Sequence, residues 1–502
     1  MRSKILILLL TLGIFGCEDF LEEKSQSEVR PSTVKDMEKI LEAEAYFGSK
    51  EGTIFNRATD IFTDDIACNV VTDQLMTIQK MRERYRFEWN RTMFDEGGGG
   101  MDVSFWDLPY QRIKGCNVVL DYVEGMDGDP VKREHIRGEA HALRGFYYMM
   151  LVNLFGMPYN YGDATKNPGV PLKLSSGVSS ERFRRNSVAE CYAQIEKDLL
   201  RGAELMEANA GKQSIKLTRM NYLAAYALLS RMYLYMEDWD NALKYADLVL
   251  QTKSDLLELR VNSTGGVYFS TTPDEILWTG LEEEVRYVTG IRAPYTVSNE
   301  LSGVYSRDAD GVIDIRGDYY RVNQEVTLAP VYLKRGREWA NGAYQYWAAL
   351  VLKSDGLNIS GSLSRYNGGI RTAEMYLNRA EVYIRKYMVS GSQEEAKRAL
   401  KDLNALRESR FDEGYVEKEI ADFTSGKELL DFCLRERRRE LCGEGNHRWF
   451  DLRRLGMPQI IHVFLDNDNG NETRVTLQEK DSRYALPIPE EVIRKNPNLS
   501  QN

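Results

Sequence analysis

The sequence has few of the residues from which catalytic and metal sites are usually built. Of its 502 residues, four are histidine and six are cysteine, and it contains no CxxC pair and no HExxH motif. The run Gly97–Gly100 lacks the Lys-Ser/Thr that follows a phosphate-binding loop. We therefore expect no cofactor, no metal site and no enzymatic activity. Sequence spacing does not exclude a glycosidase, because the paired catalytic carboxylates of such an enzyme come together only in the folded protein.

Positive charge is also in deficit. The chain has 66 Lys and Arg residues against 76 Asp and Glu, a formal net charge of -10. Nucleic-acid-binding proteins normally carry a basic surface, so we expect no nucleic-acid partner. Aromatic residues make up 11% of the chain and include 29 tyrosines. Such rings combine an apolar face with a polar edge, which suits contact surfaces as well as seams between helices.

Long hydrophobic runs are confined to the N-terminal end. Arg2 and Lys4 precede the apolar run Ile5–Leu12, which has the layout of a secretory signal peptide and is too short to span a bilayer. A small residue, Gly16, then stands directly before Cys17, an arrangement that resembles a bacterial lipobox.

We predict that residues 1–16 are removed and that Cys17 is lipidated, so that fatty chains anchor the mature body, residues 17–502. The alternative is an ordinary signal peptide. Five cysteines then remain, and an odd number cannot form a closed set of disulfides. We expect most of them to be buried thiols.

Hydrophobic periodicity predicts a mainly helical fold. Apolar residues recur at helical spacing in three segments before residue 210. These segments are 33–47, 138–156 and 187–209. Gly138, Ala142 and Gly145 line one face of the 138–156 segment, where a second backbone can approach closely.

Two further segments predict helical hairpins. Residues 219–250 turn at Asp238, and residues 371–410 contain a predicted capping box from Ser392 to Glu395. Their small residues and their length of about 34 residues resemble a tetratricopeptide repeat. We predict an α-superhelix of such hairpins, with scaffold segments at about 33–250 and 371–460.

The most informative stretch runs from Ser425 to Gly456. Ser425 and Glu428 predict a helix start, and Arg437 falls on the apolar face of that helix. A buried guanidinium must be paired, because an unpaired buried charge costs several kcal/mol, roughly. We predict that Arg437 pairs locally with Glu436, Glu440 or Glu444, or with a carboxylate on a neighbouring helix. Acidic residues alternate with the arginines here, so a structural network is favoured over a polyanion patch.

The string ERRRELCGEGNHRWFDLRRLG, residues 436–456, is similar to the C-terminal signature of the SusD/RagB family of nutrient-binding lipoproteins of Bacteroidetes. Three further segments resemble the same family. They are the aromatic-rich stretch 106–122, which resembles the family's early helix, the helix that exits at Gly156-Met157-Pro158, and the terminal stretch 485–502, ALPIPEEVIRKNPNLSQN. The resemblance implies a surface-facing outer-membrane lipoprotein. It also implies a glycan ligand and a partner, a TonB-dependent transporter of the SusC type.

Residues 251–370 change in character to Gly, Ser, Thr, Asn and aromatics, with short strand-like runs. Long irregular insertions are often where binding occurs. Aromatic rings stack on the C–H faces of sugars while polar groups bind the hydroxyls. From this pattern we predict a ligand-binding role for a small set of residues. The set is Trp89, Asn90, Tyr305, Trp339, Tyr346 and Trp347.

Three functions remain open from the sequence. The first is a glycan-binding lipoprotein paired with a transporter, and the second is a peptide-binding uptake lipoprotein at the same location. The third is a tetratricopeptide scaffold that binds no nutrient. We expect Trp106 and Trp449 to lie in the core in each case, because both fall within helical segments that resemble the family's.

Overall fold

A computed structural model gives the architecture of most of the chain. It describes residues 31–47, 59–71, 74–95, 104–178, 180–212, 216–256, 258, 276–278, 282–283, 294–305, 312, 314, 316, 333–340, 343–350, 365–366, 369–411, 414–467 and 471–502. The predicted signal peptide and Cys17 lie outside the described residues, as does much of the 251–370 insertion.

Helices make up most of the described chain. In order, the α-helices are α2 (Val34–Ile40), α4 (Gln74–Phe87), α5 (Ser104–Tyr122), α6 (Pro130–Phe155), α7 (Val188–Glu207), α8 (Tyr222–Met236), α9 (Trp239–Thr252), α11 (Asn299–Val304), α12 (Thr372–Ser390), α13 (Gln393–Glu408), α14 (Gly426–Leu441), α15 (His447–Arg454) and α16 (Glu490–Lys495). Shorter helical turns are η2 (Leu41–Ala45), η4 (Asp60–Phe62), η6 (Val123–Gly125), η8 (Ile420–Asp422) and η9 (Ser482–Tyr484). The mainly helical fold predicted from periodicity is confirmed.

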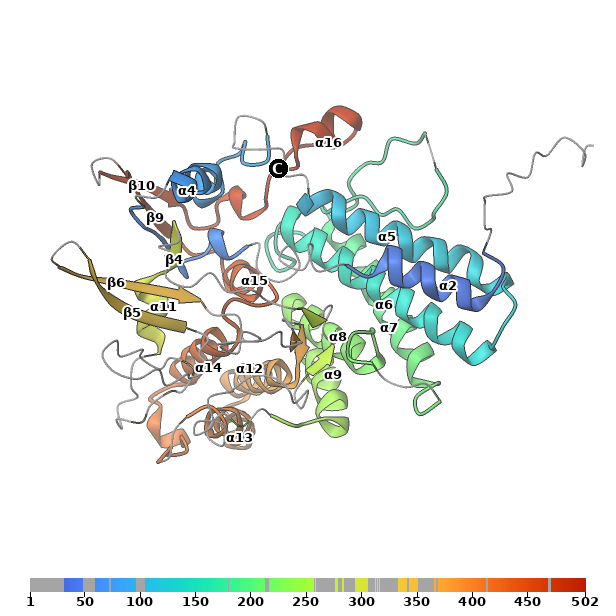
Figure 1. Cartoon of the computed structure of the whole chain (residues 1–502). Coiled ribbons are helices and arrows are strands. Elements are labelled where there is room, and N and C mark those ends of the chain that lie inside the picture. The colour runs from blue at the N-terminus through green and yellow to red at the C-terminus, as the bar shows by residue number, and fades with distance from the viewer. Residues whose placement is uncertain are drawn as a thin grey trace, which may run out of the picture.

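The strands are short and pair two at a time. They are β1 (Ile66–Cys68), β2 (Ile276–Trp278), β3 (Glu282–Glu283), β4 (Tyr295–Val297), β5 (Leu333–Ala340), β6 (Ala343–Leu350), β7 (Arg365–Tyr366), β8 (Ile370–Arg371), β9 (Ile460–Leu465) and β10 (Glu472–Leu477). The antiparallel pairs are β1 with β4, β2 with β8, β3 with β7, β5 with β6 and β9 with β10. In Figure 1 the β4, β5, β6, β9 and β10 strands lie at the left, away from the helices α5–α7.

Local signals set the ends of the long helices. Asp129 caps α6 by accepting a hydrogen bond from the Val131 amide, and Pro130 follows in the first turn, where its missing N–H is not needed. Ser187 and Glu190 form a capping box at the start of α7. These caps fix where the two longest helices begin.

The α6 and α7 helices pack closely through small residues. A Cβ atom added at Gly138 would lie 2.7 Å from Cγ of Met206, and one at Gly202 would lie 2.8 Å from the Gly138 carbonyl oxygen. Neither position has room for a side chain. The close backbone approach predicted for Gly138 and Ala142 is therefore confirmed, with α7 as the partner helix.

The two predicted hairpins are the pairs α8–α9 and α12–α13. Asp238 caps α9 by accepting from the Asn241 amide, at the predicted turn. The α12 helix packs on both α9 and α14. The helices α5, α6, α7, α8, α9, α12 and α14 thus form a series in which each packs on the next. Ser392 precedes α13 without a side-chain capping hydrogen bond, because the Glu395 amide donates to the Ser392 backbone carbonyl at 3.1 Å. The Glu395 carboxylate accepts from the Ser390 hydroxyl at 2.5 Å. The capping box predicted there is wrong.

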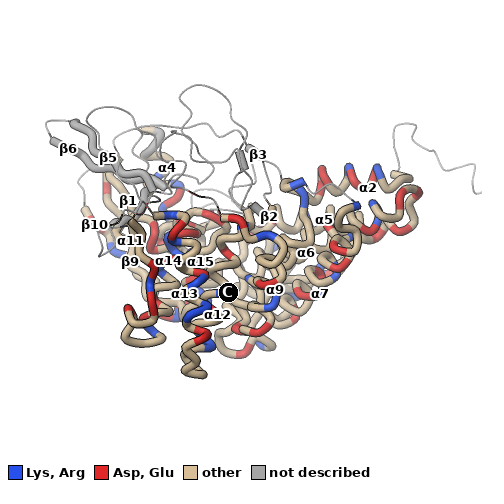
Figure 2. The backbone as a smooth tube through the Cα atoms, turned by 90° about the horizontal axis from the view of Figure 1, so that it is seen from below, with Lys and Arg blue, Asp and Glu red and all other residues tan. Residues whose placement is uncertain are grey.

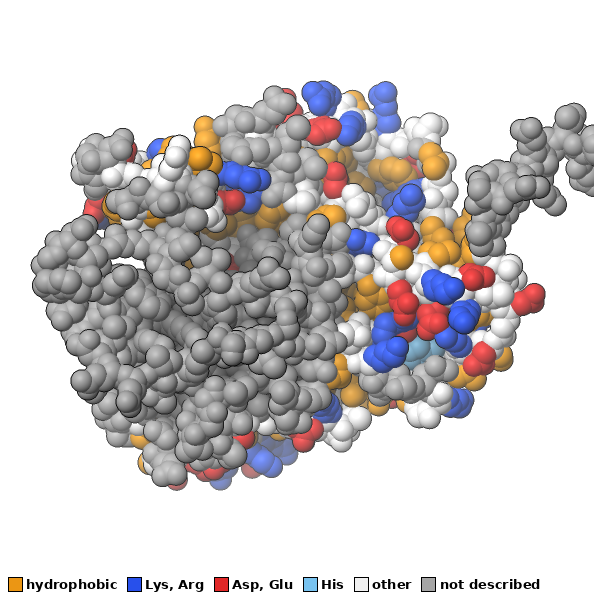
Figure 3. All heavy atoms as spheres, in the orientation of Figure 1, with side chains coloured by type: hydrophobic (Ala, Val, Ile, Leu, Met, Phe, Trp, Pro, Cys, Tyr) orange, Lys and Arg blue, Asp and Glu red, His pale blue; other side chains and the backbone are white. Residues whose placement is uncertain are grey.

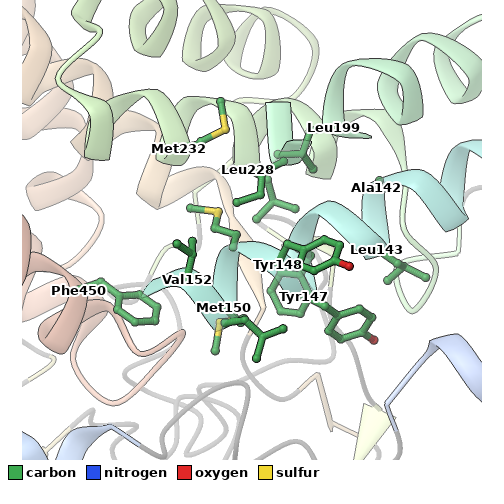
Figure 4. Close-up of a cluster of buried hydrophobic side chains, with 14 of the residues drawn as sticks. Ala142, Leu143, Tyr147, Tyr148, Met150, Val152, Leu199, Leu228, Met232 and Phe450 are labelled. Carbon is green, nitrogen blue, oxygen red and sulfur yellow. The ribbon is translucent and has the colours of Figure 1, made fainter. Parts of the chain in front are cut away.

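The main core lies where α6 crosses its neighbours. Tyr147, Tyr148 and Met150 of α6 are buried together with Leu199 of α7 and Leu228 of α8, as Figure 4 shows. A second cluster fills the space between α12, α13 and α14, with Leu377, Leu403 and Leu430 among its members. Trp106 and Trp449 are buried in the first core, as predicted.

Candidate functional site

Trp89 was predicted to contact ligand, but it is a core residue. Its side chain is 0% exposed, and its indole nitrogen donates to the Phe62 carbonyl at 3.0 Å. The ring stacks on the imidazole of His462 with centroids 4.1 Å apart. A left-handed backbone at Trp89, with φ of 50°, ends α4 and turns the chain there. The prediction of a ligand contact is wrong for Trp89, because the ring is inaccessible.

Asn90, the next residue, is half-buried and has a local structural role. Its side-chain oxygen accepts from the Thr92 amide at 3.0 Å and from the Thr92 hydroxyl at 2.9 Å. These bonds stabilise the turn after α4. A part for Asn90 in ligand binding remains a prediction.

Tyr305, at the end of α11, is also buried. It is 3% exposed, and its hydroxyl donates to the Arg439 carbonyl of α14 at 2.7 Å. Burial raises the pKa of this phenol well above its usual value, and the adjacent Cys442 thiol raises it further. The prediction of a ligand contact is wrong for Tyr305, which instead fastens the insertion to α14.

Trp339, Tyr346 and Trp347 lie on the β5–β6 hairpin. Its register pairs Trp339 with Tyr344, Arg337 with Tyr346, and Gly336 with Trp347. Residues directly opposite in an antiparallel pair share a face, and alternate residues change face. Positions 339 and 346 therefore share one face of the hairpin, and position 347 belongs to the other.

Arg437 is paired across two helices. Its Nε lies 2.8 Å from Oδ2 of Asp451 on α15, and its Nη1 donates to Oδ1 of Asn378 on α12 at 2.7 Å. Asp451 also binds Arg454 at 2.7 Å, and Arg454 makes two bonds of 2.8 Å to Glu381 of α12. The predicted pairing with a carboxylate on a neighbouring helix is confirmed.

Glu440 and Glu444 pair with other arginines. Glu440 is 0% exposed and binds Arg316, Arg371 and Arg410 at 2.9–3.1 Å. Glu444 binds Arg371 at 2.5 Å. Figure 2 shows positive and negative residues interspersed along α12, α14 and α15. We call the set Arg316, Arg371, Arg410, Arg437, Arg454, Glu381, Glu440, Glu444 and Asp451 the buried ion network.

The buried ion network also holds the insertion. Arg316 makes two bonds of 2.8 Å to Asp314, and its Nη2 lies 2.6 Å from Glu436 of α14. Sequence reasoning missed both Asp314 and Arg316, because their loop has no periodicity. Their i, i+2 spacing of opposite charges is the one signal that could have indicated a local pair. Among the described residues the insertion is thus anchored to α14 through Arg316 and Tyr305, and also through Glu300, which pairs with Arg438, and the Val304 carbonyl, which accepts from Arg439.

Acid is expected to weaken this network through Glu381. Burial alone would raise the pKa of Glu381, but the charge of Arg454 and its hydrogen bonds outweigh burial and lower the pKa from 4.5 to about 2. Because the folded state favours the ionised carboxylate of Glu381, this group stabilises the fold by about 3 kcal/mol above pH 4.5. The contribution is lost as the pH falls toward 2 and the carboxylate is protonated. Denaturant unfolding between pH 7 and pH 3 measures the loss.

A Glu381→Gln variant should lose less stability than the wild type between pH 5 and pH 3, because glutamine does not titrate. An equal loss in both proteins would show that Glu381 is not an ionised partner of Arg454.

The cysteines, the possible metal ligands, the helices and the surface charges of the described part of the chain bear on other kinds of site. Cys68, Cys116, Cys191, Cys433 and Cys442 are buried, as predicted. Within the described ranges, His, Cys, Asp and Glu form no group of three or more suited to a metal ion. We find no helix among these residues that is long and apolar enough to cross a membrane. In Figure 3, acidic and basic side chains are interspersed over the coloured surface at the right.

Protein families match both halves of the chain. Residues 19–234 match a SusD-like family described as "Starch-binding associating with outer membrane". Residues 281–502 match the SusD family. A curated relative, SusD-like protein P25 of Formosa agariphila, is 27% identical over 161 residues, which span 31% of this chain and 30% of the relative.

Solved structures share the fold over nearly the whole chain. A putative sugar binding protein from Bacteroides vulgatus is 22% identical, with a TM-score of 0.68 over 95% of this chain and 99% of that one. A SusD superfamily protein from Bacteroides thetaiotaomicron is 21% identical, with a TM-score of 0.63 over 94% and 99% of the two chains. The family matches and the shared fold agree with the motifs at residues 436–456 and 485–502, and the chain belongs to the SusD/RagB family.

Proposed function

We propose that this protein binds glycans at the outer membrane and delivers them to a TonB-dependent transporter of the SusC type. The observation that carries the proposal is the pair of family matches, since the first family is described as starch-binding and associated with the outer membrane. A structural neighbour that shares the fold is described as a sugar binding protein. The proposed role is binding and transfer of the ligand without cleavage.

The arrangement of the chain supports a binding role. The helices α5–α9, α12 and α14 pack in series, and the buried ion network fastens the insertion to this scaffold through Arg316. The insertion contributes the β5–β6 hairpin with its aromatic positions. A rigid body with aromatic residues on an attached hairpin suits an extended ligand with many sugar rings.

Affinity electrophoresis through gels that contain polysaccharides tests the proposal, with a peptide library titrated in parallel by calorimetry. We expect retardation by at least one polysaccharide and weak or no binding of peptides. Binding of peptides without any glycan would instead support a peptide-uptake function. A large outer-membrane barrel should copurify with the protein whether the ligand is a glycan or a peptide. If no barrel copurifies and neither ligand binds, the protein would instead be a tetratricopeptide scaffold that binds no nutrient.

The proposed lipid anchor predicts the outcome of labelling in cells. Palmitate label should attach to the wild-type protein and place it in the membrane fraction, because buried acyl chains contribute about 0.8 kcal/mol per methylene. A Cys17→Ser variant should lose both the label and the membrane association, whereas Cys68→Ser, a buried thiol, should keep both. Membrane association of Cys17→Ser equal to that of the wild type would contradict the anchor.

A further inference from the structure

Four tyrosines form a row on the helices α8 and α9. The ring centroids are 6.0 Å apart for Tyr222 and Tyr226, 5.6 Å for Tyr226 and Tyr245, and 5.7 Å for Tyr245 and Tyr233. We call these four residues the tyrosine row. The three tyrosines of α8 recur at i, i+4 and i+11, so they share one face of that helix and span about 16 Å along it.

One end of the tyrosine row is accessible to solvent. Tyr222 and Tyr226 are half-buried, and we call these two residues the accessible pair. Tyr233 and Tyr245 are 4% and 6% exposed, so they belong to the seam between α8 and α9. Leu228, which lies in the core in Figure 4, is on a different side of α8. The face that carries the tyrosines is therefore not the face that α8 buries in the core.

Carboxylates of α7 border the tyrosine row. Glu207 is exposed, and its Oε2 accepts from the Tyr226 hydroxyl at 2.7 Å. Burial, followed by Glu207, raises the pKa of both Tyr222 and Tyr226, so the charge of Glu207 lies close to both phenols. A second carboxylate, Glu196, accepts from the Tyr233 hydroxyl. Negative charge thus follows the row along α7.

Hydrogen-bonding groups beside the accessible pair are open to a ligand. Among the residues that the structure describes, the Tyr222 hydroxyl and Oε1 of Glu207 make no hydrogen bond. Lys244 of α9 is exposed and lies with its ammonium group 4.9 Å from the centre of the Tyr245 ring. It forms no ion pair within the described ranges. The surface therefore presents an acceptor, a hydroxyl and a cationic donor around two aromatic rings.

This combination suits a neutral sugar chain. Aromatic rings stack on the C–H faces of sugars, and carboxylates accept strong hydrogen bonds from sugar hydroxyls. Acidic sugars fit less well, because Glu196 and Glu207 outnumber Lys244 here and the whole chain has a net charge of -10. The row is longer than one sugar ring, which favours an extended polymer over a single sugar.

Resting on the proposed glycan-binding function, we propose that the tyrosine row is a contact site for neutral polysaccharide on the helical scaffold. Tyr222 and Tyr226 contact the sugar rings, while Glu207 and Lys244 hydrogen-bond to their hydroxyl groups. In Figure 1 the helices α8 and α9 lie apart from the β5–β6 hairpin. The contact is therefore separate from the aromatic positions of the insertion.

Polymers that differ in charge test the class of ligand. Titration calorimetry would compare polygalacturonate with its methyl-esterified form, which has the same backbone without the charge, and with starch as a second neutral polymer. The wild type should bind at least one neutral polymer about tenfold or more tightly than polygalacturonate, because the carboxylates and the net charge repel an acidic chain.

Tyr222→Ala and Glu207→Gln test whether the tyrosine row makes the contact. Each should weaken binding of the neutral polymer about threefold to tenfold, since the first removes a stacking ring and the second removes a charged acceptor of nearly the same shape. Tyr122→Ala, on α5, and Glu394→Gln, on α13, change exposed residues elsewhere and should leave the affinity unchanged. Thermal unfolding checks that all four variants are folded.

Failure of the tyrosine row and failure of the proposed function give different results. If the wild type binds a neutral polymer and folded Tyr222→Ala and Glu207→Gln bind it equally well, the row is not a contact site and the proposed function stands. Tighter binding of polygalacturonate than of every neutral polymer would overturn the neutral preference and also leave that function standing. No binding of any polymer would overturn the proposed function and the contact site together.

Discussion

Replacement of Glu440 by glutamine should lower the free energy of unfolding by about 3 to 5 kcal/mol, the usual cost of breaking a buried ion pair. Glu440 is fully buried and accepts hydrogen bonds from three arginines, two of which, Arg316 and Arg371, belong to or directly follow the insertion. Glutamine has nearly the same shape but lacks the charge that offsets these cations. Chemical denaturation at pH 7 measures the difference.

The control for this change is an exposed glutamate on a nearby helix. Glu394 of α13 pairs with Arg398, and both side chains are more than half exposed. A Glu394→Gln variant should change stability by less than about 0.5 kcal/mol, because solvent screens exposed pairs. Equal effects of the two substitutions would contradict a stabilising role for the buried ion network.

Replacement of Trp89 by alanine should cost about 3 to 5 kcal/mol of stability and leave ligand affinity unchanged. The substitution removes a fully buried indole, its hydrogen bond to Phe62 and its stacking on His462, and leaves a cavity beneath the β9–β10 hairpin. Denaturant unfolding measures the stability, and calorimetry with a bound polysaccharide measures the affinity.

Tyr122, at the end of α5, is the matched aromatic control. It is 54% exposed, so Tyr122→Ala should change stability by less than about 0.5 kcal/mol. A Trp89→Ala protein of normal stability that has lost affinity for glycan would contradict the core role of Trp89 and place the residue in the ligand site.

The sequence predicts a helix correctly where that helix buries one apolar face. The periodicity of 138–156 and the small residues Gly138 and Ala142 correctly predicted α6 and its close packing on another helix, because these patterns depend on local geometry alone. The pairing of Arg437 could also be predicted, since burial of a guanidinium requires an acceptor. The choice of Asp451 over Glu436, Glu440 and Glu444 depends on the angle between α14 and α15, which the sequence does not define.

Ligand residues were harder to predict than the fold. Trp89 and Tyr305 stand in stretches without clear period, where an aromatic residue can face solvent or core. Their burial depends on partners distant in the chain, His462 and Arg439, that no local pattern indicates. The register of the β5–β6 hairpin is equally hidden, although it decides that positions 339 and 346 share a face while position 347 does not.

The most direct test of the central claim is a calorimetric titration of purified protein with polysaccharides, followed by a reducing-end assay on each mixture after prolonged incubation. We predict saturable binding of at least one polysaccharide and no increase in reducing ends. The absence of binding to every polysaccharide, or a steady release of new reducing ends by the pure protein, would contradict the assignment as a glycan-binding protein that does not cleave its ligand.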